Sequence, residues 1–255
     1  TADETCMLAW QGNAASRPGR SLKIDKNDKA ITIDTGTATV VCTRGDTIRE
    51  YRINNGSVLL QPVRLRMELA TVGMNMELFP LPAETMELEE AGLLHATVRI
   101  QGAFASAGNA RTAFRYDVRI HTSLDSSRVN VLTTITHAAS RSAFARVLDA
   151  SVHCMIPAAP GEWLLGADRG VEKVAPGELT QLIQPDDLKY EIVQDGKTIS
   201  SGTRAAGWLS AAVKDGWLIV GSRHFWQNHP KSLFFTKKSA GIRLWAGNDA
   251  FEWEG

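Results

Sequence analysis

Hydrophobic and polar residues alternate along most of the chain with a period of two. The alternation is clearest in the middle, where residues 94–100, 114–121 and 128–135 place apolar and polar side chains on opposite faces. This period is that of a β-strand with one buried face. Turn residues separate successive runs, roughly every eight to twelve positions, a spacing typical of antiparallel strands. The pattern therefore predicts an all-β fold, a large antiparallel β-sandwich.

The same pattern continues toward the C-terminus. Residues 208–213 and 217–222 predict two strands around the tripeptide Lys-Asp-Gly at 214–216, and Asp-Gly is a strong hairpin signal. The second of these strands delivers residues 223–227 to a strand end. Only residues 185–188 suggest a helical turn.

The N-terminal segment differs from the rest of the chain. Residues 1–20 show no periodicity and contain the breaker cluster Arg-Pro-Gly, so we expect a leader or loose segment there. No linker divides residues 21–255, which we predict to be a single large sandwich domain. The chain begins without Met, as would a mature secreted form or an excised fragment.

The charge balance narrows the classes of partner. The chain has 28 basic and 28 acidic residues, and nucleic-acid binders instead need clustered positive charge. No apolar run is long enough to predict a membrane span. The cysteines Cys6, Cys42 and Cys154 lie far apart, so either buried free thiols or one disulfide with an odd thiol is expected. We expect no metal and no cofactor.

The densest group of aromatic, basic and imidazole side chains is the segment R-H-F-W-Q-N-H-P-K at residues 223–231. Aromatic faces stack on pyranose C–H groups, while cations and amides bind carboxylates and hydroxyls. An imidazole can abstract the proton in a β-elimination, and an ammonium group can neutralise the sugar carboxylate. The predicted substrate-binding residues are Arg223, Trp226 and Gln227, and the predicted catalytic residues are His224, His229 and Lys231. The alternative is that Phe225 and Trp226 belong to the core and that the two histidines are ordinary loop residues.

The other titratable side chains give weaker signals. Four histidines lie on or beside strands without the spacing of metal ligands, namely His95, His121, His137 and His153. Several carboxylates could serve a glycosidase, but the sequence does not place two of them across a sugar ring: Glu89, Glu90, Asp168, Asp186 and Asp187.

Arginines alternate with an acidic residue on the polar face of the central strands. They are Arg99, Arg115, Arg119 and Arg128, with Asp117 among them. Cross-strand salt pairs on a wet face explain them, and an anion-binding groove is the alternative.

Several of these segments resemble the exo-rhamnogalacturonan lyase family, typified by the YetA-like polysaccharide lyases and related ulvan-lyase-like proteins. The resemblance is carried by residues 89–102, 116–120, 223–231 and 242–245. The family's last motifs read R-D-F-W-Q-x-[YF]-P-K and L-W-P. Here His224 stands at the acidic position and Ala246 at the proline.

The resemblance implies a large sandwich of the galactose-mutarotase-like kind, the supersandwich. It also implies a secreted or periplasmic protein that acts on acidic polysaccharides or oligosaccharides such as pectic rhamnogalacturonan. The family typically carries an α/α-toroid after the sandwich. We therefore expect one of three situations: this chain is a fragment of a larger protein that has the toroid, an oligomer partner takes its place, or the sandwich works without it. The alternatives are a non-catalytic sandwich that binds glycan or protein or has a structural role, and, more distantly, an aldose-epimerase-like enzyme.

Overall fold

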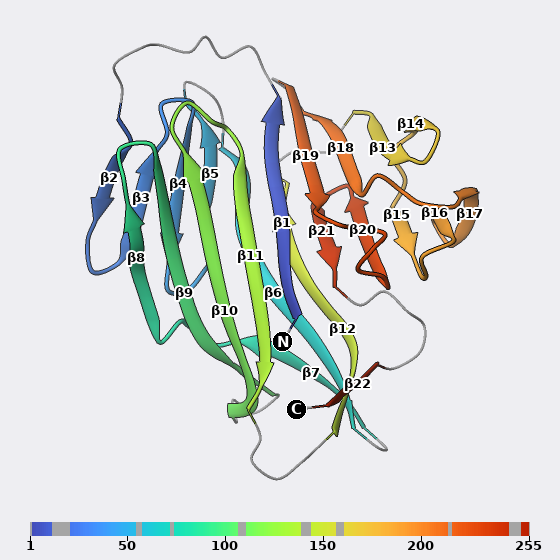
Figure 1. Cartoon of the computed structure of the whole chain (residues 1–255), viewed down its shortest axis with the longest axis horizontal. Coiled ribbons are helices and arrows are strands. Elements are labelled where there is room, and N and C mark those ends of the chain that lie inside the picture. Colours follow the sequence, from blue (N-terminus) through green and yellow to red (C-terminus); the bar gives the residue numbers. More distant parts are fainter. Residues whose placement is uncertain are drawn as a thin grey trace.

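The computed structural model consists of β-strands joined by turns and loops (Figure 1). It describes residues 2–11, 21–54, 58–71, 74–106, 111–138, 144–156, 161–213, 216–244 and 251–254. These residues contain no helix, and therefore none long and apolar enough to cross a membrane. The all-β class and the antiparallel pairing predicted from the alternation are confirmed.

The strands have the following bounds: β1 Ala2–Gln11, β2 Lys23–Lys26, β3 Ala30–Asp34, β4 Ala38–Thr43, β5 Glu50–Ile53, β6 Val58–Thr71, β7 Met74–Pro80, β8 Thr85–Ala91, β9 His95–Ala105, β10 Arg111–Ser123, β11 Val129–His137, β12 Phe144–Met155, β13 Trp163–Ala167, β14 Gly170–Val174, β15 Leu179–Gln184, β16 Tyr190–Gln194, β17 Lys197–Gly202, β18 Trp208–Val213, β19 Gly216–Ser222, β20 Lys231–Thr236, β21 Ser239–Arg243 and β22 Phe251–Glu254.

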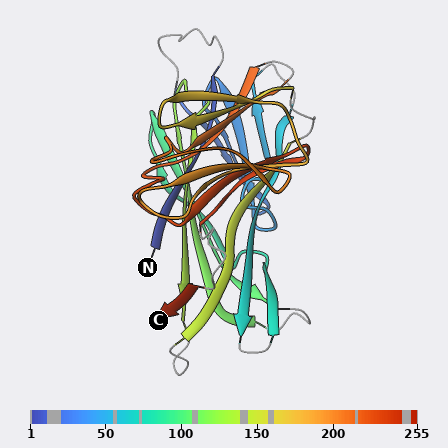
Figure 2. The same ribbon diagram turned by 90° about the vertical axis from the view of Figure 1, so that its right-hand side faces the viewer.

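The strands form two large antiparallel sheets. The first sheet runs in the order β8-β9-β10-β11-β1-β19-β18-β13-β14. The second sheet runs β2-β3-β4-β5-β6-β12-β21-β20-β15-β16-β17. Strand β7 pairs with both β6 and β9, which links the sheets at one side. Figure 1 shows β2 to β5 behind β8 to β11, and Figure 2 shows β6 and β12 as neighbouring long strands.

One continuous hydrophobic core lies between the sheets. In β10 every second side chain from Phe114 to Thr122 is buried, and the first sheet supplies further buried side chains such as Val98 and Ile120. The second sheet supplies Ile31 and Val40, both fully buried. Burying each such side chain contributes about 1.5–3 kcal/mol, so the alternation fixes which face of each strand turns inward.

The N-terminal segment differs from the expected loose leader. Residues 2–11 form β1, which pairs with β11 on one side and β19 on the other, so this strand joins the two halves of the first sheet. Residues 12–20 lie outside the described part of the chain. The strand escaped sequence analysis because A-D-E-T-C-M-L-A-W-Q lacks regular alternation.

Two cysteines are free and buried, Cys42 and Cys154. Burial raises the pKa of both thiols to about 12. This agrees with the expectation of free thiols at those two positions. The side chain of Cys6 lies outside the description.

Candidate functional site

The segment that sequence analysis selected forms the turn between β19 and β20. Residues 223–228 make this turn, and Lys231 begins β20. The preceding hairpin follows the prediction, since β18 and β19 pair antiparallel with Val213 opposite Gly216. The two residues between them, 214 and 215, lie outside the described part of the chain. The turn therefore connects the first sheet to the second.

The turn is fixed to the segment preceding β18 by one apolar side chain. Phe225 is 2 % exposed and lies against Gly207, where an added Cβ would be 2.2 Å from the Phe225 Cβ. The backbone N–H of Ser222 donates to the Gly207 carbonyl at 2.9 Å. His224 has a positive φ of 56°, which helps the chain reverse direction at this point. Phe225 thus belongs to the core, as the alternative interpretation held.

Trp226 is half-buried and has a cationic neighbour from another segment. The guanidinium of Arg204 lies 4.3 Å from the centroid of its ring, within the range of a cation–π contact. Arg204 Nε also donates to the carbonyl of Asp187 at 3.1 Å, which restrains the guanidinium. Arg204 could not be predicted from the sequence as a neighbour of Trp226, because no local pattern relates the two residues.

The remaining polar side chains of the turn face solvent. Arg223, His224, Gln227 and His229 are exposed. His229 Nδ1 lies 3.2 Å from the carbonyl of Trp226, a contact that a protonated Nδ1 would make as a donor. The amide of residue 228 donates to the His224 carbonyl at 3.0 Å. Arginine, imidazole and amide groups thus surround the indole on one short turn.

Lys231 does not share this surface. Lys231 is only 1 % exposed, and its backbone pairs with that of Gln184 on β15. Gln184 is also fully buried, and its side chain bonds four backbone groups, which are the carbonyls of residues 186, 189 and 203 and the N–H of Ala205. The structure brings five of the six predicted residues together at the turn and places the ammonium-bearing one inside.

A comparison with protein families matches residues 22–154 to the PcRGLX-like protein central beta sandwich domain. The chain belongs to this family. The match includes the motifs at 89–102 and 116–120 and ends before the turn at 223–231, and a comparison with curated proteins finds no match. The PcRGLX-like assignment thus confirms the family resemblance expected from the sequence.

The arginine-rich face of the PcRGLX-like domain is a network of salt pairs. Arg99 contacts the carboxylate of Asp117 at 2.6–3.2 Å, through its Nε and a terminal nitrogen. Arg119 binds Glu89 with two hydrogen bonds, at 2.8 and 3.1 Å. Hydrogen bonds to the carboxylates raise the pKa of both guanidinium groups. The salt-pairing interpretation is confirmed for these arginines, whose charge is compensated within the face.

The strand histidines of the domain do not form a single cluster, although His95 and His121 both lie near Glu90. His95 pairs with Glu90 at 2.9 Å, while His121 Nδ1 lies 2.9 Å from the hydroxyl of Thr97. His153 lies on the other sheet, where Nε2 contacts the Ser151 hydroxyl at 2.7 Å. Burial, reinforced by two nearby arginines, lowers the pKa of His153 to about 4. No group of three or more His, Cys, Asp or Glu side chains in the described residues could hold a metal ion.

The carboxylates considered for a glycosidase have local structural partners. Asp168 accepts hydrogen bonds from the Tyr190 hydroxyl and from the backbone and side chain of Thr203. Asp186 accepts one from the N–H of Leu188 at 2.8 Å. Residues 186–188 form a bend, not the expected helical turn. These contacts give both carboxylates a role in holding loops.

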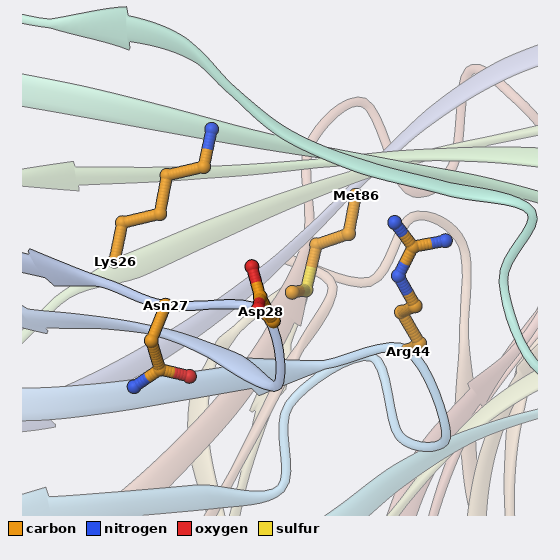
Figure 3. A pocket seen from close by; sticks show the side chains of 5 residues that line it. All are labelled: Lys26, Asn27, Asp28, Arg44 and Met86. Atoms are coloured by element: carbon orange, nitrogen blue, oxygen red, sulfur yellow. The ribbon is translucent and has the colours of Figure 1, made fainter.

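A hollow elsewhere in the domain was not found by sequence analysis. Three separate segments line this hollow. The lining residues are Lys26, Asn27, Asp28, Arg44 and Met86 (Figure 3). Each of these residues lies in an ordinary turn or strand pattern, so only the folded arrangement distinguishes them.

Proposed function

We propose that this PcRGLX-like domain binds an acidic polysaccharide as part of a polysaccharide-lyase-type protein, and that the turn at 223–229 supplies the contacts. The observation that carries the proposal is the stack of Arg204 on Trp226, set among exposed cationic, imidazole and amide side chains. An indole beside a restrained guanidinium suits a pyranose that carries a carboxylate.

In this proposal each residue of the site makes a different contact with the glycan. Trp226 packs on the C–H groups of the sugar ring, and Arg204 with Arg223 attracts its carboxylate. Gln227 binds hydroxyl groups through its amide, which both donates and accepts. The buried Lys231 has no direct contact with the glycan in this proposal.

A β-elimination would use the exposed imidazoles. His224 or His229 would take the proton from the sugar carbon next to the carboxylate, whose charge a neighbouring arginine neutralises. The electrons of that C–H bond form the new C=C bond as the glycosidic oxygen leaves. A secreted or periplasmic protein would meet such a polymer, and the galactose-mutarotase-like supersandwich is the corresponding finer fold proposal for the two sheets.

Binding is tested by calorimetry with oligogalacturonate, with a neutral galacto-oligosaccharide of the same length as the reference. Trp226→Ala and Arg204→Ala are each expected to weaken oligogalacturonate binding by about tenfold, or about 1.4 kcal/mol. Arg52→Ala is the matched control, because Arg52 is exposed on β5, which β6, β12 and β21 separate from β20 in the second sheet. Equal affinity for the neutral sugar, or unchanged binding by Trp226→Ala, would refute the proposal.

Turnover is tested separately by the ultraviolet absorbance of the unsaturated product, across pectic and ulvan-type substrates. If product forms, His224→Ala and His229→Ala identify the base, because only the variant lacking it loses the elimination step while still binding oligogalacturonate. Binding without product from any substrate would establish the non-catalytic function and refute the elimination.

A further inference from the structure

An open hollow of about 570 Å³ lies where the turn between β2 and β3 approaches β8. Figure 3 shows the five residues that line it, which come from the end of β2 and the turn after it, from the loop after β4 and from β8. Its volume falls within the roughly 300–1,000 Å³ of small-molecule sites. All five residues lie within the part of the chain that matches the family.

The turn between β2 and β3 is held by its own asparagine. The side-chain oxygen of Asn27 accepts hydrogen bonds from the N–H groups of Lys29 and Ala30 at 2.9 and 3.0 Å. This closes the turn, as Asn side chains commonly do. Lys26 and Asp28 flank Asn27 and therefore have fixed backbone positions on either side of it.

The guanidinium of Arg44 is also fixed. One terminal nitrogen donates to the carbonyl of Glu84 at 2.6 Å and, more weakly, to that of Ala83 at 3.4 Å. The backbone N–H of Ala83 in turn donates to the Arg44 carbonyl at 2.7 Å. No hydrogen bond joins the other two guanidinium nitrogens to a described residue, so a fork of donors remains beside Met86.

The charges at the hollow contrast with those on the arginine-rich face. Within the described ranges, no ion pair involves Lys26, Asp28 or Arg44, whereas Arg99 and Arg119 are both paired to carboxylates. The lining has two cations and one acid. Met86, only 9 % exposed, supplies the apolar surface.

We infer that this hollow binds a single carboxylate-bearing sugar residue, separately from the turn at 223–229. The sugar carboxylate lies between Arg44 and Lys26, where two cations outweigh the repulsion from Asp28. Asp28 binds ring hydroxyls, and the C–H face of the ring packs on Met86. The evidence is the hollow itself, and it holds whether or not the turn binds glycan.

The methyl group of Met86 offers a readout specific to this site. The chain has six methionines, and methyl-¹³C labelling with Met86→Leu as the assignment variant identifies the signal. Titration with galacturonate should shift the Met86 methyl resonance and saturate, whereas galactose, which has a hydroxymethyl group in place of the carboxylate, should not. Met155, exposed on the second sheet, is the internal reference and should not move.

Lys26→Ala should raise the Kd for galacturonate, measured from the Met86 methyl shift, about fivefold or more. The substitution removes a cation without breaking any contact within the described fold. Arg44→Lys keeps the positive charge but loses the paired guanidinium donors, and should raise the Kd as well. The matched control is Lys23→Ala, exposed on the same strand β2. An unshifted Met86 methyl, an equal response to galactose, or an unchanged Kd in Lys26→Ala would each overturn the inference. Trp226→Ala should leave this titration unchanged, so a failure at the turn and a failure at the hollow are distinguishable.

Discussion

Phe225 occupies the space that a side chain on residue 207 would need. An added Cβ at Gly207 would lie 2.2 Å from the Phe225 Cβ and 2.7 Å from its Cγ, and Gly207 has a φ of 76°. Two segments distant in sequence therefore meet closely at this glycine. Arg204 and Trp226, which stack on each other, lie one to three positions away in each segment, so this contact also aligns the candidate glycan site.

Gly207→Ala is expected to destabilise the fold by at least about 2 kcal/mol, because it adds a steric clash to the strain of a positive φ. Gly196 has a similar φ of 79° with nothing within 4 Å. Gly196→Ala is therefore the matched control and should cost only about 1 kcal/mol. Urea unfolding midpoints measure both, and equal losses would show that the contact with Phe225 adds nothing.

Asp117→Asn is expected to destabilise the domain by about 1–2 kcal/mol. The wild-type carboxylate accepts hydrogen bonds from Arg99 and Gln101, and the side chain is only 19 % exposed. The amide retains the shape but loses the charge that compensates Arg99. Glu178→Gln, which disrupts the exposed pair with Lys237, should leave the free energy of unfolding unchanged. Similar effects of the two substitutions would contradict the importance of burial.

His153 should make stability depend on pH. Its pKa in the folded protein is about 4, below the ordinary 6.5, chiefly because burial disfavours the charged form. The unfolded chain therefore binds a proton more readily, so the contribution of His153 is present above pH 6.5 and is lost as the pH falls toward 4. The loss is at most about 3 kcal/mol.

The matched measurement compares the wild type with His153→Gln by urea unfolding at several pH values. Burial raises the pKa of the neighbouring Asp149, which acts in the opposite sense but is present in both proteins. From pH 7 to pH 4 the free energy of unfolding of the wild type should fall relative to that of His153→Gln. Parallel curves would mean that His153 titrates normally.

Leu8→Pro should unfold or strongly destabilise the chain, by at least about 3 kcal/mol. Leu8 pairs with Val129 on one neighbouring strand and Val220 on the other, so a residue without an N–H breaks the ladder inside the sheet. Leu8→Ala separates the backbone effect from the loss of the side chain. Hydrogen exchange at β11 and β19 gives the local readout, and unchanged protection in the proline variant would exclude β1 from the sheet.

The sequence predicted the strands whose burial alternates. In β10 and β11 burial alternates from Phe114 to Thr122 and from Val129 to Ile135, because a half-buried strand leaves a local signal. Leu132 on the outward face and the buried Thr133 are exceptions to the apolar and polar assignment. Strand β1 left no such signal. Its position depends on partners far along the chain, which local propensity does not specify.

The candidate site was predictable only as a segment. The sequence located the turn and its indole, but not the burial of Lys231, since a lysine after a polar turn has no local mark of an inward orientation. Arg204 and the hollow around Arg44 depend on contacts between separate segments. Gly102 shows the same limit, because the ring of Tyr116, on the neighbouring strand, occupies the space that a side chain at residue 102 would need.

The central place of β1 has a consequence for the order of events during synthesis. In the chain β1 precedes every other strand of its sheet, and it cannot acquire its second neighbour until β19 has been made. Until then the backbone donors and acceptors on the edge of β1 that faces β19 remain available to other chains. A nascent chain of this protein would therefore depend on chaperones, or on fast completion, until the residues around Val220 emerge.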